Sequence, residues 1–177
     1  MSELPKSATP ALGGRNMAQF MCAHPAHLLA QGFGSGLSPV MPGTTGTLFG
    51  WASYAALTAA APTWFSPIHW ALIIVAGFAI GIWACERTGR DMGVSDHGSM
   101  VWDEIIAFWL ILLFVMPAGF STQLWAFVLF RFFDMVKPPP IRYFDKHIKG
   151  GFGVMWDDIV AAFYTLLVFA LWRANAA

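Results

Sequence analysis

Residues 131–146 read RFFDMVKPPPIRYFDK, a charged stretch between two apolar segments of the chain. Arg131, Asp134 and Lys137 are spaced three residues apart, so on a helix their side chains share one face. The proline run that follows predicts an extended break. Charges inside apolar segments are costly and by default indicate a functional site. An interfacial ion pair that only neutralises itself is the alternative interpretation.

Two adjacent carboxylates, Asp157 and Asp158, stand at the mouth of the last apolar segment. We expect the residues before them, Gly150-Gly151-Phe152-Gly153, to form a loop. One acid at such a position can be explained by stabilisation of the helix dipole. The second acid of the pair is then left for another role.

The composition of the whole chain indicates a membrane protein. The 177 residues fit one domain. They are 57% apolar and 11% charged, against roughly 25% charged in an average soluble protein. The formal net charge is zero, so there is no overall field to attract nucleic acid, and we expect no nucleic-acid partner.

Five apolar segments predict an all-α fold, a compact helical membrane bundle with about four to five apolar helices plus short interfacial helices. Spanning the hydrocarbon layer takes about 20 apolar residues, and only residues 67–85 approach that length unaided. We expect a disordered N-terminal tail, residues 1–16, and one helical membrane domain, residues 17–177. The apolar segments are residues 48–61, 67–85, 105–115, 123–130 and 159–172.

Pairing the first four segments as two hairpins brings the polar stretches to one membrane face. Both expected turns, residues 61–67 and 117–122, carry no charge. Every Lys and Arg residue except Arg173 then lies on one side of the membrane, and Arg173 lies on the opposite side. The positive-inside rule makes that side cytoplasmic.

Residues 86–104, ERTGRDMGVSDHGSMVWDE, supply a second group of charges to this face. We expect Gly93 to end one helix and Ser99 to cap the next, which carries Asp103 and Glu104. Neighbouring side chains on a helix point about 100° apart, so only one of these two acids should face a site squarely.

The stretch GFGSGLSPVMPGTTGT, residues 32–47, is rich in glycine, proline and hydroxyl groups and predicts a loop. Such a loop can offer backbone N–H groups and hydroxyls to an anion. It is not a P-loop, because the lysine of that motif is missing. A simple helix-breaking connector is the alternative.

Together, these stretches indicate metal-assisted hydrolysis of a phosphate ester. An excess of carboxylate oxygens suits a hard cation such as Mg²⁺. Neighbouring arginine and lysine side chains suit a phosphate group. A cation that bridges phosphate and water would activate both. The residues give this reaction class without a substrate.

Four ordered motifs resemble the phosphatidylglycerophosphatase A family of bacterial inner-membrane lipid phosphatases. They are HLLAQGFGSGLSPVMPGTTGT, RDMGVSDHGSMVWDE, FRFFDMVKPPPIR with FD after it, and GGFGVMWDDIVA, and together they cover nearly the whole chain after residue 16. The resemblance implies Mg²⁺-dependent removal of the terminal phosphate of phosphatidylglycerophosphate, in phospholipid biosynthesis, by a multi-pass inner-membrane protein with its site facing the cytoplasm. The family often has Trp where Pro139 stands, a difference that affects packing only.

With this resemblance in view, we assign roles to the charged and hydroxyl residues. Asp96 or His97 is the candidate for activating water or protonating the leaving oxygen. Glu104 and Asp157 are further candidates, as catalytic acids or as additional metal ligands. No Cys-x₅-Arg loop is present in the sequence, which excludes a cysteine phosphatase. The expected Mg²⁺ ligands are Asp103, Asp134 and Asp158, and the expected phosphate-binding residues are Arg131, Lys137, Arg142, Ser35 and Thr44.

Three other functions compete with this one. A phosphatase of another lipid or isoprenoid phosphate shares the same chemistry. An ion- or proton-coupled transporter would carry acids near the membrane midplane, often with internal repeats, whereas here the acids lie at segment ends. A membrane assembly factor leaves the paired acids and loop glycines unexplained. The oligomeric state is not predicted.

Overall fold

The computed structural model describes residues 10–139 and 141–176, and within them every regular element is a helix. This confirms the predicted all-α class. Residues 1–9 of the expected tail lie outside the described residues. The elements are α1 (Met17–Cys22), α2 (Pro25–Ala30), the 3₁₀ helix η1 (Gly32–Leu37), α3 (Pro42–Ala60), α4 (Pro67–Met92), α5 (Trp102–Val115), α6 (Phe120–Val136), α7 (Ile141–His147) and α8 (Gly150–Ala176).

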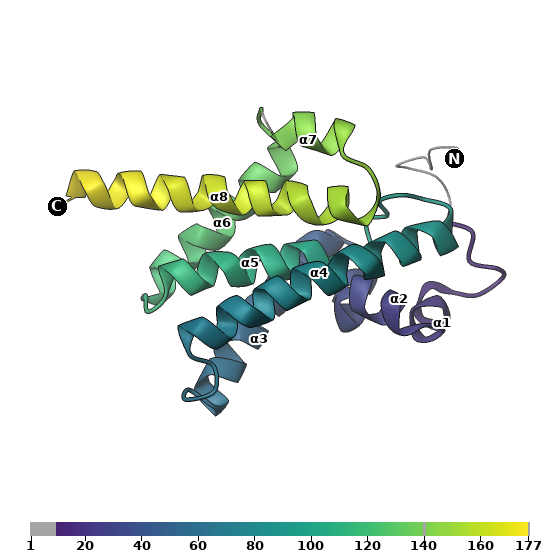
Figure 1. The fold of residues 1–177 in the computed structure, drawn as a ribbon, viewed down its shortest axis with the longest axis horizontal. Coiled ribbons are helices and arrows are strands. Elements are labelled where there is room, and N and C mark those ends of the chain that lie inside the picture. The colour runs from purple at the N-terminus through teal and green to yellow at the C-terminus, as the bar shows by residue number, and fades with distance from the viewer. Residues whose placement is uncertain (1–9, 140, 177) are drawn as a thin grey trace.

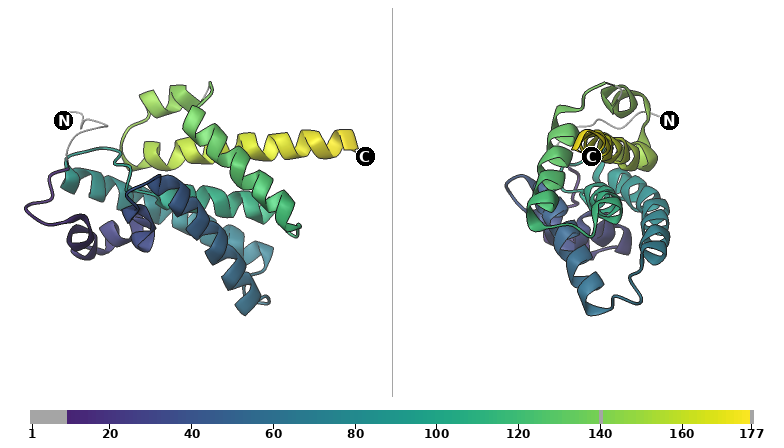
Figure 2. Two further views of the ribbon diagram at one scale, coloured as in Figure 1. Left: turned by 180° about the vertical axis from the view of Figure 1, so that it is seen from behind. Right: turned by 90° about the vertical axis from the view of Figure 1, so that its left-hand side faces the viewer.

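Helix α5 lies at the centre of the bundle. It packs against α3, α4, α6 and α8, which surround it in the end-on view of Figure 2. Ile105, Ile106 and Phe108 are wholly inaccessible to solvent, as expected for a helix that is apolar on every side. The first turn of α5, which carries Asp103 and Glu104, is therefore enclosed by its neighbours.

Prolines and one glycine set several helix boundaries. Pro42 and Pro67 stand in the first turns of α3 and α4, where the missing proline N–H leaves no hydrogen bond unmade. Gly93 ends α4 in the left-handed conformation (φ 69°), as predicted. The predicted cap at Ser99 is wrong: α5 begins after Val101, and the Ser99 hydroxyl instead lies 2.8 Å from His97 Nδ1.

The predicted loop at residues 32–47 is only partly correct, because α3 already begins at Pro42. Three glycines lie on one face of α3: Gly43, Gly46 and Gly50. Because they are small, α3 can closely approach α5 and Val101, the residue before α5. A Cβ on Gly46 would lie 2.6 Å from Val101 Cβ. Close tertiary packing thus outweighs the low helix propensity of glycine.

The predicted loop at Gly150–Gly153 is wrong, because these residues form the first turn of α8. A Cβ on Gly151 would lie 1.9 Å from the Ile82 carbonyl oxygen of α4. The glycine therefore permits contact between α4 and α8. Glu86 completes the junction by accepting a hydrogen bond from the Gly151 N–H at 2.7 Å, which satisfies one donor at the start of the helix.

Within the described residues, two helices, α4 and α8, are long and apolar enough to cross a membrane. The predicted number of four to five apolar membrane helices remains a prediction. Figure 1 shows the α3–α4 turn, the α5–α6 turn and the C-terminus at one end of the molecule, and α1, α2 and the 93–101 connection at the other. The arrangement agrees with the two hairpins inferred from the sequence.

Replacing Gly151 tests the α4–α8 contact. Gly151→Ala should force the two helices apart and cost about 1–3 kcal/mol of stability, as overpacking does in well-packed interiors. The measurement is the thermal unfolding midpoint of the purified protein in detergent. Gly119→Ala is the matched control, because a Cβ there meets nothing within 4 Å. Gly119 is the N-cap of α6, so the midpoint should fall only by the small cost of a poorer cap. Equal midpoints for the two variants would contradict the packing argument.

Candidate active site

Three buried or half-buried acids meet where α5 packs against α8. Asp103, Glu104 and Asp158 each offer one carboxylate oxygen, and these oxygens all lie within 4.8 Å of one another. Asp103 and Asp158 are 7% and 3% exposed, so water does little to screen their charges. We call these three residues the acid cluster.

Both neighbouring acids of α5 take part in this cluster, contrary to the expectation that only one could. Asp103 Oδ1 accepts the Glu104 N–H at 3.0 Å, and a carboxylate oxygen of Glu104 still lies within 4.8 Å of those of Asp103 and Asp158. The side chains of the second pair of adjacent acids, Asp157 and Asp158, point in different directions, as helix geometry predicts. Asp158 joins the cluster, and Asp157 contacts Lys137 of the neighbouring helix terminus.

The acid cluster has the properties of a cation site. Within the described residues, Glu104 Oε2 and Asp158 Oδ2 are buried and accept no hydrogen bond. Leaving a buried charged acceptor without a partner is costly. Burial raises the pKa of the Asp103 carboxyl well above its ordinary value, and the nearby Glu104 raises it further. A hard divalent cation bound by oxygens would remove both costs, so the residues present fit Mg²⁺.

Arg131 of α6 lies at the edge of the acid cluster. Its Nη1 contacts Asp134 Oδ2 at 2.9 Å and lies 3.7 Å from Glu104 Oε1. The Arg131–Asp134 pair predicted from their spacing is therefore present. Within the described residues the buried Nε of Arg131 makes no hydrogen bond, so one donor of the guanidinium is left unsatisfied.

Helix α3 holds Arg131 from the other side. Thr47 Oγ1 accepts a hydrogen bond from Arg131 Nη1 at 3.3 Å. A Cβ on Gly43 would lie 2.3 Å from Glu104 Oε1 and 2.9 Å from Arg131 Nη2, so any side chain there would displace these two charged groups. The sequence assigned neither role, because both depend on how α3 packs against α5 and α6.

Lys137 and Asp157 form a second charged contact beside the cluster. Lys137 ends α6 in the left-handed conformation (φ 46°), and its ammonium contacts the Asp157 carboxylate. Burial opposes the charge of Lys137, but Asp157 and Asp158 outweigh burial and raise the pKa of the ammonium. Lys137 therefore stays positively charged close to the acids.

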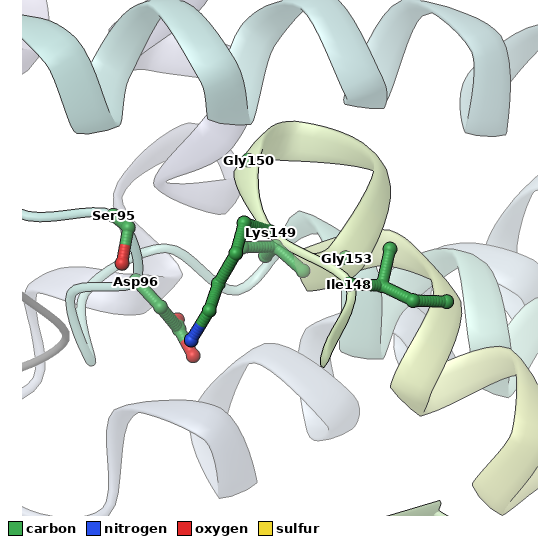
Figure 3. A pocket seen from close by; sticks show the side chains of 7 residues that line it. Ser95, Asp96, Ile148, Lys149, Gly150 and Gly153 are labelled. Atoms are coloured by element: carbon green, nitrogen blue, oxygen red, sulfur yellow. The ribbon is translucent and has the colours of Figure 1, made fainter. Parts of the chain in front are cut away.

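The 93–101 connection carries Asp96 and His97 to the same end of the bundle. Asp96 lies near enough to Asp103 to raise the pKa of its carboxyl. Figure 3 shows the Lys149 side chain pointing toward the Asp96 carboxylate across a small pocket beside the start of α8. Burial lowers the pKa of His97, and the charge of Asp96 opposes that effect.

The remaining predicted residues lie apart from these contacts or at their margin. Ser35 uses its hydroxyl inside the 3₁₀ turn, where it donates to the Gly32 carbonyl at 2.8 Å. Thr44 follows Gly43, and its buried Oγ1 has no hydrogen-bond partner among the described residues. Arg142 is exposed on α7. The phosphate-binding roles of these three residues remain predictions.

Acids gathered beside arginine and lysine at one end of an apolar helical bundle fit one class of protein, the helical enzymes that hydrolyse phosphate esters. The chain belongs to the phosphatidylglycerophosphatase A family, whose family model matches residues 28–173. It is a phosphatase. Family membership sets aside the transporter and assembly-factor alternatives.

Relatives with this name cover most of the chain. A protein of Escherichia coli (strain K12) named Phosphatidylglycerophosphatase A is 46% identical over 144 residues, 78% of each chain. A protein of Haemophilus influenzae with the same name is 45% identical over 145 residues, 82% of this chain and 86% of the relative. A Putative phosphatidylinositol-3-phosphatase of Bacteroides thetaiotaomicron is 38% identical over 151 residues, 82% of this chain and 92% of the relative. No solved structure matches significantly.

Metal binding tests the acid cluster independently of activity. Titration with Mn²⁺, followed by electron paramagnetic resonance, should reveal binding that weakens by more than about tenfold in Glu104→Gln and in Asp158→Asn, because each loses a charged oxygen ligand. Asp91→Asn is the control, since Asp91 pairs with His27 and Arg87 and lies outside the cluster. Unchanged Mn²⁺ affinity in both cluster variants would rule out this ligand set.

Proposed function

We propose that the protein hydrolyses the terminal phosphomonoester of phosphatidylglycerophosphate, giving phosphatidylglycerol and inorganic phosphate, with Mg²⁺ as its cofactor. The observation that carries the proposal is the acid cluster, three carboxylates of which two, Glu104 and Asp158, have a buried oxygen with no hydrogen-bond donor among the described residues. The names of the two relatives that are 45–46% identical support the substrate. The reaction belongs to phospholipid biosynthesis.

In this proposal Asp103, Glu104 and Asp158 hold Mg²⁺, which when bound supplies positive charge to the phosphate and to the attacking water. Asp134 holds Arg131 in place and is the next candidate for a ligand. The Mn²⁺ titration tests Glu104 and Asp158 of this set.

The basic side chains bind the substrate phosphate. The guanidinium of Arg131 is oriented by Asp134 and Thr47, so its positive charge is already held in place for a phosphoryl group. Lys137, oriented by Asp157, adds a second positive charge. These charges offset the negative charge that develops on phosphoryl oxygens during transfer.

Asp96 is our candidate for the general base. It would accept a proton from water as the water oxygen attacks phosphorus, and the bond from phosphorus to the glycerol oxygen would break. A proton returned to that glycerol oxygen balances the reaction. Lys149 points toward Asp96 across the small pocket and would place a positive charge on that side of the carboxylate.

We further propose that the protein is a multi-pass protein of the bacterial inner membrane with the acid cluster facing the cytoplasm. The two candidate spans support a membrane location. Asp103 and Glu104 stand in the first turn of α5, which follows the 93–101 connection at the end of the bundle away from the two hairpin turns and the C-terminus (Figure 1). The hairpin arrangement inferred from the sequence brings all Lys and Arg except Arg173 toward that side.

A second candidate substrate is phosphatidylinositol 3-phosphate. The relative named Putative phosphatidylinositol-3-phosphatase is 38% identical and covers a similar share of the chain. Both lipids carry a phosphomonoester on a polyhydroxyl headgroup, so the same acids and basic groups could serve either one.

Phosphate release from lipid in mixed micelles tests function and cofactor together. With Mg²⁺, the purified protein should hydrolyse phosphatidylglycerophosphate at least about tenfold more efficiently (kcat/KM) than phosphatidylinositol 3-phosphate, which corresponds to about 1.4 kcal/mol of transition-state discrimination. Chelation with EDTA should abolish release, and added Mg²⁺ should restore it. Turnover that persists in EDTA would refute the metal proposal. A preference for the inositol lipid would refute the substrate proposal and leave the phosphatase intact.

A further inference from the structure

The hydrogen bonds of His97 determine which ring nitrogen carries its proton. The backbone N–H of Ser99 donates to His97 Nδ1 at 3.2 Å, and Ser99 Oγ lies 2.8 Å from the same nitrogen. An amide N–H can only donate, so Nδ1 must present its lone pair. The neutral ring then carries its proton on Nε2.

A buried glutamine fixes the direction of this arrangement. Gln31, at the end of α2, is wholly inaccessible to solvent, and its Nε2 donates to Ser99 Oγ at 3.3 Å. Because the Ser99 oxygen accepts from Gln31, its own hydrogen can point toward His97 Nδ1 at 2.8 Å, a much nearer acceptor than Met17 Sδ at 3.9 Å. The donors therefore run from Gln31 through Ser99 to His97.

The other ring nitrogen of His97 remains available. Within the described residues no hydrogen bond engages Nε2, and the side chain is only partly buried. The 93–101 connection, which carries His97, lies at the rim of the acid cluster. A Cβ on Gly98 would lie 4.0 Å from Pro42, and the next residue, Gly43, packs against Glu104 and Arg131. The Nε2–H is therefore left without a partner among the described residues at this end of the bundle.

We propose that His97 acts as a neutral hydrogen-bond donor, through Nε2–H, to a phosphoryl oxygen of the substrate, and that Ser99 and Gln31 are positioning residues that fix this tautomer. The inference rests on the proposed phosphatase function and assigns His97 a role other than proton transfer. Its Nδ1 lone pair is already occupied, and its Nε2 already holds a proton, so His97 cannot serve as the base.

The electrostatic surroundings agree with a neutral ring. Burial lowers the pKa of His97, and the Ser99 N–H would oppose a proton on Nδ1. The negative charge of Asp96 opposes the effect of burial by raising the pKa of His97. The phosphate receives a donor that remains in place across the neutral pH range, and the proton transfers fall to Asp96.

Nitrogen-15 NMR of histidine-labelled protein in detergent tests the tautomer directly. At pH 7 the His97 signal, assigned by its loss in His97→Gln, should be that of the neutral Nε2–H form. Gln31→Met, which removes the donor to Ser99 and keeps a similar volume, should add Nδ1–H tautomer or broaden the signal. A charged or Nδ1–H ring in the wild-type protein would overturn the proposal.

Substitution of His97 tests the donor role. His97→Ala should lower kcat by about 100-fold, the cost of removing one preorganised donor. His97→Gln, which keeps an N–H at a similar reach, should stay within about tenfold of wild type. His69→Gln is the control, because His69 contacts Ser66 beside the α3–α4 turn at the opposite end of the bundle. Equal losses in His97→Gln and His97→Ala, with an ionisation missing from both pH profiles, would indicate proton transfer and overturn the proposal.

The two proposals fail separately. If the wild-type protein releases no phosphate from any lipid phosphate, the proposed function is refuted, and the NMR experiment still decides whether the tautomer argument is correct. If the lipid is hydrolysed and the ring is not in the Nε2–H form, only the role of His97 is refuted.

Discussion

Mutual repulsion among buried carboxylates is the constraint on which the rest of this structure depends. Asp103, Glu104 and Asp158 bring their oxygens within 4.8 Å of one another in a region that water screens poorly. Such a group is stable only with compensating positive charge. Arg131 and Lys137 supply part of it from α6, and one oxygen each of Glu104 and Asp158 has no hydrogen-bond partner among the described residues. In our proposal a divalent cation supplies the rest.

The helices are arranged to sustain this concentration of charge. Gly43 lets α3 approach Glu104 and Arg131, and Gly151 lets α8 approach α4. Glycine at these contacts costs helix propensity, and the bundle recovers that cost through close packing. The consequence for function is a set of side chains that are already oriented: Asp134 holds Arg131 and Asp157 holds Lys137.

The sequence predicts the helical class and the stretches that form the site, for physical reasons that can be named. Hydrophobic segments and uncharged turns imply hairpins, and hairpins bring residues 86–104 and 131–158 to one end. The spacing of Arg131 and Asp134 correctly predicts their ion pair. The contacts of Glu104 with Asp103 and Asp158 were not predictable, because they depend on how α5 is rotated against α8. The link from Ser99 to His97 was also missed, since capping chemistry predicted a different partner for that hydroxyl.

The central claim is that the acid cluster is a divalent metal site. The most direct measurement is an experimental structure of the protein with Mn²⁺ in place of Mg²⁺, with the ion located by anomalous scattering. The account predicts an anomalous peak bonded to carboxylate oxygens of Asp103, Glu104 and Asp158, with Arg131 beside it. A well-occupied Mn²⁺ bound elsewhere, with these three carboxylates free of metal, would contradict it.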